Sequence, residues 1–208
     1  MLAGRSRSHS VSHLVPDPQA VDARNVVKLF VAITDRSWFD RLSAEKPDEV
    51  NFWQPSGRTT FRALQPGELF LFKLHAPTNV IVGGGVFSHA SSVPLSMAWD
   101  AFRTKNGVAS LSEMRQRIAR YRKDAALLDE RQDPLIGCRI LTSPFFWPQQ
   151  AWLPVPASFA PNIVTGRGYS TDDAEGVTLW DAVAERMALA VPAESDPPRL
   201  GIPTLVRP

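Results

Sequence analysis

Aromatic rings, amides and arginines gather in one stretch of the sequence, residues 50–87. The side chains there that are suited to contact a nucleotide are Asn51, Phe52, Trp53, Gln54, Arg58 and Arg62. An aromatic ring can stack on any base, an amide forms hydrogen bonds with a base edge, and an arginine neutralises a phosphate. This combination favours a nucleic-acid reader over an enzyme.

The adjacent rings Phe52 and Trp53 must have different surroundings if their segment is extended, because successive side chains of a strand point to opposite faces. One ring should then lie in the core and the other at a pocket or at the surface. We expect Trp53 to be the stacking residue. The amides of Asn51 and Gln54 either read a base or satisfy the ends of a strand.

A carboxylate and an indole stand together after the first apolar run. Asp35 precedes residues 36–43, a segment with the composition of a short helix that contains Trp38. Asp35 either caps this helix or accepts a hydrogen bond from an exocyclic amine, as carboxylates do from cytosine N4. Trp38 either packs in the core or faces a ligand. We include both residues in the predicted base pocket, together with Asn51, Phe52, Trp53 and Gln54.

Basic residues form a stripe along a predicted helix over residues 111–123, where Ser110 and Glu113 have the spacing of a capping box. The stripe is either a solvated helix face or a surface that contacts phosphates. Arg58 and Arg62, in a turn after Trp53, leave the same two alternatives open. We expect five arginines to bind phosphates: Arg58, Arg62, Arg115, Arg117 and Arg120.

Catalytic and metal chemistry find little support in the sequence. His75 and His89 do not have metal-ligand spacing, and no set of nucleophile, base and orienting residue can be assembled. The three glycines at positions 83–85 open no helix in a βαβ unit, so they do not indicate a dinucleotide site. A bulge that lets a base or the backbone approach closely explains them better. The sequence predicts no catalytic residue, no metal and no cofactor.

Composition places the chain among ordinary globular proteins. It has 208 residues, 44% hydrophobic and 21% charged, with a net charge of +2. Cys138 is its single cysteine, so no internal disulfide is possible, and a buried strand position is its expected place. No apolar run is long enough to span a bilayer and no secretory signal is recognisable, so we expect a cytoplasmic protein without membrane contact.

The order of predicted elements indicates one α+β domain between two tails. Residues 1–25 are expected to be a disordered arm, residues 26–190 the folded domain, and residues 191–208 a proline-rich tail. Strands are predicted at residues 26–34, 50–53, 69–74, 80–87 and 136–142, and helices at 36–43, 95–105, 111–123 and 171–190. Helices inserted between irregularly spaced strands favour a bent or barrel-like, mostly antiparallel sheet.

Several motifs resemble the EVE group of the PUA-like superfold, which also includes SRA domains that read methylated cytosine. They are NFWQPSG and FRALQPGELFLFKLHAPTNVIVGGGVF. Together with FVAITDRSWF, PLSMAWDAF, IGCRIL, PFFWP and NIVTG, they are similar to the N-terminal reader of bacterial HNH endonucleases of the modification-dependent restriction type. The resemblance covers about four fifths of the chain. It implies a PUA-like fold with the base pocket near the turn at Asp35 and Trp38.

This resemblance also implies a function and a partner. The expected ligand is double-stranded DNA carrying a modified base, a C5-modified cytosine above all, which is flipped into the aromatic pocket. The expected partner is an HNH nuclease domain or subunit, with residues 191–208 as the linker to it. The chain has no paired-histidine cluster of HNH type, so we do not expect it to cut DNA by itself. The alternatives are a PUA-like RNA-binding domain and an orphan protein-interaction module.

Overall fold

The computed structural model describes residues 26–58 and 61–190. The predicted arm (1–25) and tail (191–208) lie outside the described residues. The strands are β1 Lys28–Thr34, β2 Glu49–Asn51, β3 Leu69–Leu74, β4 Val80–Pro94, β5 Leu135–Phe146, β6 Leu153–Pro154 and β7 Gly166–Ser170. The α-helices are α1 Arg36–Glu45, α2 Leu95–Phe102, α3 Leu111–Arg122 and α4 Ala174–Ala190, and the 3-10 helices are η1 Arg103–Asn106, η2 Ala125–Leu128 and η3 Gln149–Ala151.

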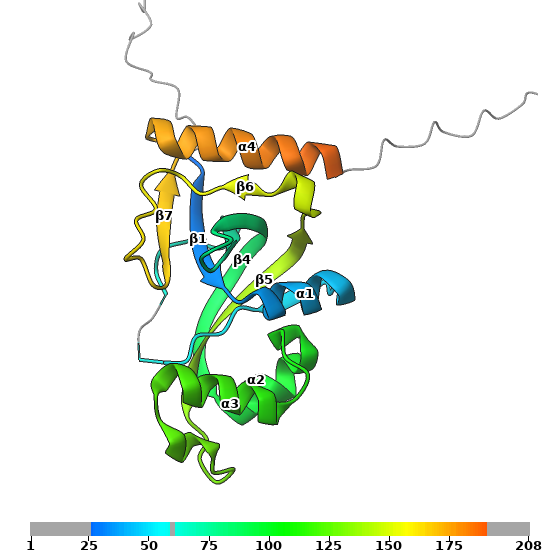
Figure 1. Ribbon diagram of the computed structural model, residues 1–208, viewed down its shortest axis with the longest axis vertical. Coiled ribbons are helices and arrows are strands. Elements are labelled where there is room, and N and C mark those ends of the chain that lie inside the picture. The colour runs from blue at the N-terminus through cyan, green and yellow to red at the C-terminus, as the bar shows by residue number, and fades with distance from the viewer. Residues whose placement is uncertain (1–25, 59–60, 191–208) are drawn as a thin grey trace, which may run out of the picture.

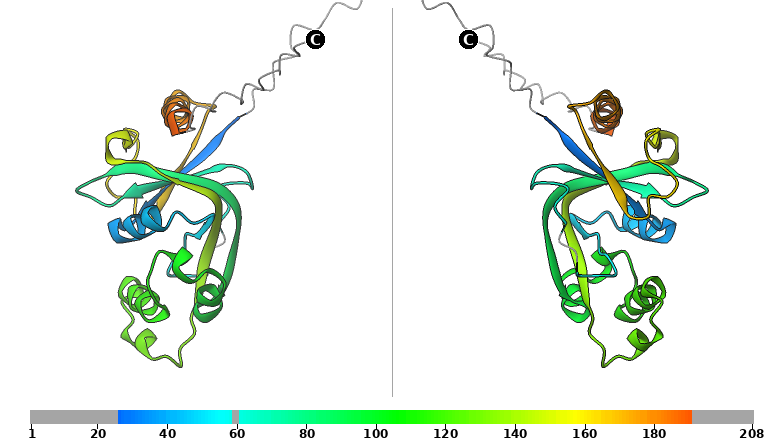
Figure 2. Two further views of the ribbon diagram at one scale, coloured as in Figure 1. Left: turned by 90° about the vertical axis from the view of Figure 1, so that its right-hand side faces the viewer. Right: turned by 90° about the vertical axis from the view of Figure 1, so that its left-hand side faces the viewer.

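All of these strands belong to one bent sheet. Its order is β2-β5-β4-β3-β1-β7, and the short β6 pairs with β4. The long strands β4 and β5 curve away from the rest of the sheet and carry α2 and α3 at their far end, while α4 lies across the opposite end (Figures 1 and 2). The predicted α+β class, with a bent sheet and helices inserted between strands, is therefore confirmed.

The sheet is mostly antiparallel, as expected, and contains one parallel pair. β1 and β3 run parallel, with Leu29 opposite Leu69, whereas the other pairs are antiparallel. A parallel pair needs a crossover connection, which α1 and β2 supply here. β4 and β5 also extend beyond their predicted ends to Pro94 and Phe146, because the two strands pair with each other along this extra length.

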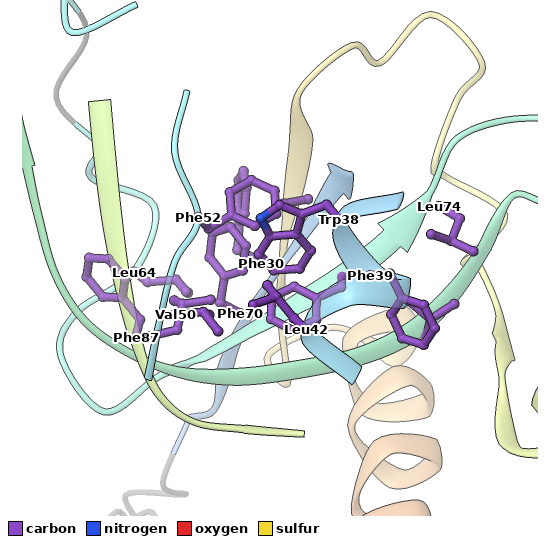
Figure 3. Close-up of a cluster of buried hydrophobic side chains, with 14 residues drawn as sticks. Phe30, Trp38, Phe39, Leu42, Val50, Phe52, Leu64, Phe70, Leu74 and Phe87 are labelled. Atoms are coloured by element: carbon purple, nitrogen blue, oxygen red, sulfur yellow. The ribbon is translucent and has the colours of Figure 1, made fainter. Parts of the chain in front are cut away.

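Two hydrophobic clusters cover the two faces of the central strands. On one face, the rings of Phe30, Phe70 and Phe72 pack with α1, which buries Trp38 and Leu42 (Figure 3). The alternation of side chains along β3 sends Leu69 and Leu71 to the other face, where the buried residues of α4 cover them. Both faces of β3 are therefore buried, which explains the apolar run over residues 69–72. Lys73, which follows this run, is also buried and donates to the Leu74 carbonyl.

The glycine run at the start of β4 lies inside the sheet. All three glycines are buried, and a Cβ on Gly84 would come within 2.7 Å of the Phe70 carbonyl oxygen and 2.8 Å of the Phe145 ring. The close approach that the glycines permit is thus made by the neighbouring strands β3 and β5.

A third cluster joins α2 and α3 to the outer half of β5. Met114 and Ile118 of α3 are fully buried against Ile136 and Cys138 of β5. The predicted capping box begins α3: the Glu113 amide donates to Ser110 Oγ at 3.1 Å, and the Glu113 carboxylate accepts from the Ala109 amide at 2.7 Å. This packing fixes which face of α3 is turned toward α1 and the segment after β2.

Candidate functional site

A cavity of about 290 Å³ lies where the end of β1, the start of α1, the segment after β2 and one face of α3 meet. Five of the six predicted base-pocket residues line it: Asp35, Trp38, Phe52, Trp53 and Gln54. Arg117 and Tyr121 of α3 and His75, which follows β3, complete the charged and polar part of its wall. Its volume is at the lower end of the range for small-ligand sites, about 300 Å³, and suits a single base.

The carboxylate of Asp35 is directed to the cavity residues instead of to its own helix. Asp35 occupies the N-cap position of α1, but its side chain makes no capping hydrogen bond. Its Oδ2 accepts a hydrogen bond of 2.6 Å from the Tyr121 hydroxyl and lies 3.7 Å from Arg117 Nη1, and its Oδ1 lies 3.6 Å from His75 Nε2. Of the two roles left open for Asp35, capping is thus not the one observed.

Tyr121 is a cavity residue that the sequence analysis did not single out. Burial, followed by the hydrogen bond to Asp35, raises the pKa of Tyr121 to about 12, so its hydroxyl stays protonated at neutral pH. It lies four residues after Arg117, and residues with this spacing share a helix face. That spacing was the available signal. For His75 no comparable signal exists, because its position depends on the parallel pairing of β1 and β3.

Trp53 is a half-buried ring of the cavity wall that is anchored at its polar end. Its indole Nε1 donates to the Asn106 carbonyl at 2.9 Å, and its ring meets that of Tyr121 edge-on, with centroids 6.4 Å apart. Gln54, beside it, is joined to Gly137 through its backbone in both directions, at 2.7 and 3.1 Å. The backbone is therefore fixed, and the Gln54 amide side chain is half-buried at the cavity.

Trp38 and Phe52 form the floor of the cavity. Both are buried, at 4% and 5% exposure, and their rings pack edge-to-face at 5.3 Å (Figure 3). Trp38 makes a second such contact with Phe72 at 5.0 Å. Gly107 (φ 71°) covers the indole so closely that a Cβ there would come within 2.1 Å of Trp38 Cδ1. Trp38 therefore packs in the core, and the part of its ring that remains accessible forms the inner wall of the cavity.

Asn51 does not line the cavity. It is fully buried, and its Nδ2 donates to Asn106 Oδ1 at 2.9 Å and to Cys138 Sγ at 3.3 Å. Asn106 in turn donates to the carbonyls of Ala98 in α2 and of Arg103 in η1. Because the Asn106 carbonyl holds Trp53, Asn51 supports the wall of the cavity from behind. The side chain points there because β2 pairs with β5 and turns this face of the strand inward.

The predicted phosphate-binding arginines are divided between surface and interior. Arg58, Arg62 and Arg120 are exposed, and the Arg120 guanidinium lies 5.5 Å from the centre of the Tyr121 ring. Arg115, in contrast, is buried and donates to the carbonyls of Leu127, Asp129 and Gln132. Its hydrogen bonds hold the loop after α3, so the expected phosphate contact does not suit this position.

Arg117 lines the cavity in an ion-pair network. Its guanidinium donates to Glu113 Oε1 at 2.7 Å and to Ser37 Oγ at 3.0 Å, besides its proximity to Asp35. Burial alone would raise the pKa of Glu113, but the Ala109 amide and Arg117 hold it below its usual value. With two carboxylates beside it, Arg117 is better suited to orient Asp35 than to neutralise a phosphate.

The described residues contain neither a metal-binding cluster nor a membrane-spanning helix. Residues 26–58 and 61–190 contain no cluster of three or more histidine, cysteine, aspartate or glutamate residues able to hold a metal ion. No helix in the same part of the chain is long and apolar enough to cross a membrane.

No protein-family profile matches the chain, and no curated protein matches it. Among solved structures it is similar to the ASCH protein of Zymomonas mobilis, at 11% identity and a TM-score of 0.47, over 74% of this chain and 94% of that one. A tyrosine-to-phenylalanine variant of that protein is similar at 10% identity and a TM-score of 0.47, over 74% of this chain and 97% of that one. A serine-to-alanine variant is similar at 10% identity and a TM-score of 0.46, over 74% of this chain and 95% of that one. Similarity at this level assigns no role to any residue.

Proposed function

We propose that the chain is a DNA reader that admits one extruded modified base, a C5-modified cytosine, into the cavity between α1 and α3. The carrying observation is that the Asp35 carboxylate leaves its own helix uncapped and instead meets Tyr121 in a base-sized cavity lined by Trp53 and Gln54. An unused cap sacrifices a typical stabilisation of about 1 kcal/mol, which makes a role in ligand binding the simpler explanation.

The chemistry of the cavity suits the edge of cytosine. Its N4 amine needs an acceptor, which the Asp35 carboxylate provides while it is held by the Tyr121 hydroxyl, and its acceptors need a donor, which the Gln54 amide provides. Thymine would place its O4 against the same carboxylate, and two acceptors repel each other. The Trp53 ring supplies stacking, which is typically worth about 1–3 kcal/mol per base. A methyl group at C5 adds on the order of 1 kcal/mol if it is buried.

Binding has a second, sequence-independent part. The exposed arginines Arg58, Arg62 and Arg120 bind phosphates of the duplex and release counterions, so this part weakens steeply with salt. Extrusion of the base costs a few kcal/mol, which stacking and hydrogen bonds in the cavity offset. The predicted outcome is modest affinity for any duplex and a preference for the modified one.

Duplexes that differ only in one cytosine test the proposal: unmodified, 5-methyl and 5-hydroxymethyl, with 2-aminopurine beside the site to report base extrusion. We expect the full chain to prefer a modified duplex by about 10-fold, with a fluorescence rise on binding. Trp53→Ala and Asp35→Asn should abolish the preference and the rise. Trp180→Ala on α4 and Asp40→Asn on α1 remove the same chemical groups away from the cavity and should retain both.

Three results would count against the proposal. Equal binding of all duplexes by every variant would refute the base pocket. Tighter binding of a single-stranded RNA of the same sequence, at equal salt, would keep the pocket but replace DNA by RNA as the ligand. A lack of salt-dependent affinity for any nucleic acid would favour a protein-interaction module instead.

We further propose that the reader serves a modification-dependent restriction system with an HNH nuclease domain or subunit as its partner. The sequence motifs at residues 51–57 and 61–87 support this part. Mixing the chain with an HNH nuclease encoded beside it should give cleavage of the modified duplex only. Cleavage that is indifferent to the modification would contradict this part and leave the base pocket untouched.

A further inference from the structure

Arg139 of β5 is a buried cation without a buried anion. The residue is only 9% exposed, and its guanidinium carbon lies 4.3 Å from the centre of the Phe61 ring and 5.8 Å from those of Phe30 and Phe70. Its Nη1 is buried and has no hydrogen-bond partner among the described residues. Burial lowers the pKa of Arg139 to about 10, so the group is still charged at neutral pH.

Such an arrangement is unfavourable by itself. Arginine is almost never buried unless it is paired. A buried N–H group without an acceptor has given up its hydrogen bonds to water and has formed no hydrogen bond in their place. The three phenyl rings supply cation–π attraction, but an aromatic face does not replace the hydrogen-bond acceptors that the guanidinium fork requires. The site therefore lacks the planar or tetrahedral oxyanion with which a guanidinium normally pairs.

A second cavity, of about 240 Å³, adjoins this side chain. Arg139 and Phe61 form part of its wall, and the hydroxyls of Ser56, Ser91 and Ser92 form another part. None of the described residues that line it is acidic, so Arg139 supplies its only formal charge. Gln54 lines this cavity as well as the first one, so both cavities adjoin the segment after β2.

We propose that this second cavity is an oxyanion site, in which Arg139 and the serine hydroxyls bind a phosphate or a carboxylate group. The guanidinium offers two parallel N–H donors to the oxygens of the anion, and the hydroxyls donate to its remaining oxygens. Phe61 holds the guanidinium plane in place by stacking on it. The site stands independently of the proposed base pocket, because Arg139 and the three serines do not line the first cavity and inorganic phosphate, the main probe, carries no base.

Thermal unfolding of the full chain tests the site with inorganic phosphate as the probe. At constant ionic strength, exchange of chloride for phosphate should raise the melting temperature saturably, by at least about 2 °C. Arg139→Met should show no rise, and without phosphate it should melt no lower than the wild type, because a methionine fills similar space without a buried charge. Arg131→Gln removes one charge at an exposed loop position and should keep the full rise.

A second measurement uses the wild-type protein, so it does not depend on whether a variant folds. The Nε–Hε resonance of Arg139 in the wild-type protein should shift saturably with phosphate and remain fixed with chloride. Acetate and a nucleoside 5′-monophosphate, compared with the free nucleoside, identify the source of the oxyanion. A shift with acetate alone assigns a carboxylate, whereas a shift with the nucleotide but not the nucleoside assigns a nucleic-acid phosphate. An unmoved resonance and an unchanged melting temperature with all of these anions would overturn the proposal.

Discussion

At the scale of single residues, Asp35 and Tyr121 form a hydrogen bond with each other across the cavity instead of serving only their own helices. Asp35 could cap α1 and instead accepts a hydrogen bond from Tyr121. Tyr121 belongs to the apolar spacing of α3 and instead presents its hydroxyl to the cavity. Helix α1 lacks a side-chain cap as a result, and both polar groups lie in the cavity wall, where a ligand can contact them.

The titration of Tyr121 should report this contact. The chain has two tyrosines, so Tyr169→Phe leaves one phenol to follow by its ultraviolet absorbance. Burial and Asp35 raise the pKa of Tyr121 from 10.0 to about 12, and the added change Asp35→Asn should lower it by about one unit. Asp40→Asn should not move it. A midpoint that is insensitive to residue 35 would show that the hydrogen bond does not form in solution.

The same shift makes folding stability depend on pH. The pKa of Tyr121 is higher in the folded protein than its ordinary value of 10.0, so the neutral phenol stabilises the fold below pH 10. This contribution should be lost as the pH rises through about 12. Urea unfolding of Tyr121→Phe and of the wild type at increasing pH checks the sign, since the phenylalanine variant lacks this particular loss.

Gly107 should be intolerant of any side chain for two separable reasons. Its φ is 71°, and a Cβ would come within 2.1 Å of the Trp38 indole. We expect Gly107→Ala to lower the free energy of unfolding by roughly 2–4 kcal/mol. Gly67→Ala is the matched control, because Gly67 also has a positive φ of 93° but has nothing within 4 Å of its Cβ position. If both variants lose the same free energy of unfolding in urea denaturation, the Trp38 indole moves aside for the new methyl group at no measurable cost in stability.

At the scale of elements, α3 shows how one helix can carry basic residues for different purposes. Its capped N-terminus and its buried face fix the rotation of the helix, so each arginine is sent to a definite neighbour. Arg115 points into the loop after η2, Arg117 into the ion pairs of the cavity, and Arg120 toward solvent beside Tyr121. A stripe that is uniform in the sequence is therefore divided in the structure.

This division predicts opposite outcomes for two equal substitutions. Arg120→Gln should weaken binding to all duplexes alike and reduce the salt dependence of the affinity by about one unit of slope. Arg115→Gln should leave that slope unchanged but lower the free energy of unfolding by about 2–3 kcal/mol, because it breaks charged hydrogen bonds to buried carbonyls. Gel-shift titrations at several salt concentrations and urea denaturation measure both. A changed slope for Arg115→Gln would place that residue on the DNA.

At the scale of the whole molecule, the bent sheet separates support from recognition. α4 covers one end of the fold (Figure 1). It packs on the face opposite α1, whereas the cavity opens between α1 and α3. Of the residues that line the cavity, Ile33 of β1 also packs against the cluster that α4 covers. The fold therefore allows stability and ligand preference to be altered independently.

A core substitution under α4 tests this independence. Leu179 is 5% exposed, and Leu179→Ala should lower the free energy of unfolding by about 2–5 kcal/mol. The preference for the modified duplex should stay unchanged at temperatures where the variant is folded. Leu189, on the same helix, is 80% exposed, and Leu189→Ala should alter stability by less than about 0.5 kcal/mol. A lost preference in Leu179→Ala would mean that α4 shapes the cavity through the sheet.

Local patterns in the sequence were sufficient for the element types and for much of the cavity. β3 has its predicted bounds, α3 ends within one residue of its predicted end, and five of the six predicted pocket residues line one cavity. Apolar runs, periodicity and caps act over a few residues, so one sequence reveals them. The pocket residues were chosen for their side-chain chemistry and, at Asp35 and Trp38, also for the family resemblance.

The tertiary structure alone decided where side chains point. The parallel pairing of β1 with β3 brought His75 to Asp35, the packing of α3 buried Arg115, and the pairing of β2 with β5 turned Asn51 inward. Each of these depends on contacts between segments that are distant in sequence. Such contacts select among faces that local propensity leaves equivalent, and so no pattern within a single element could reveal them.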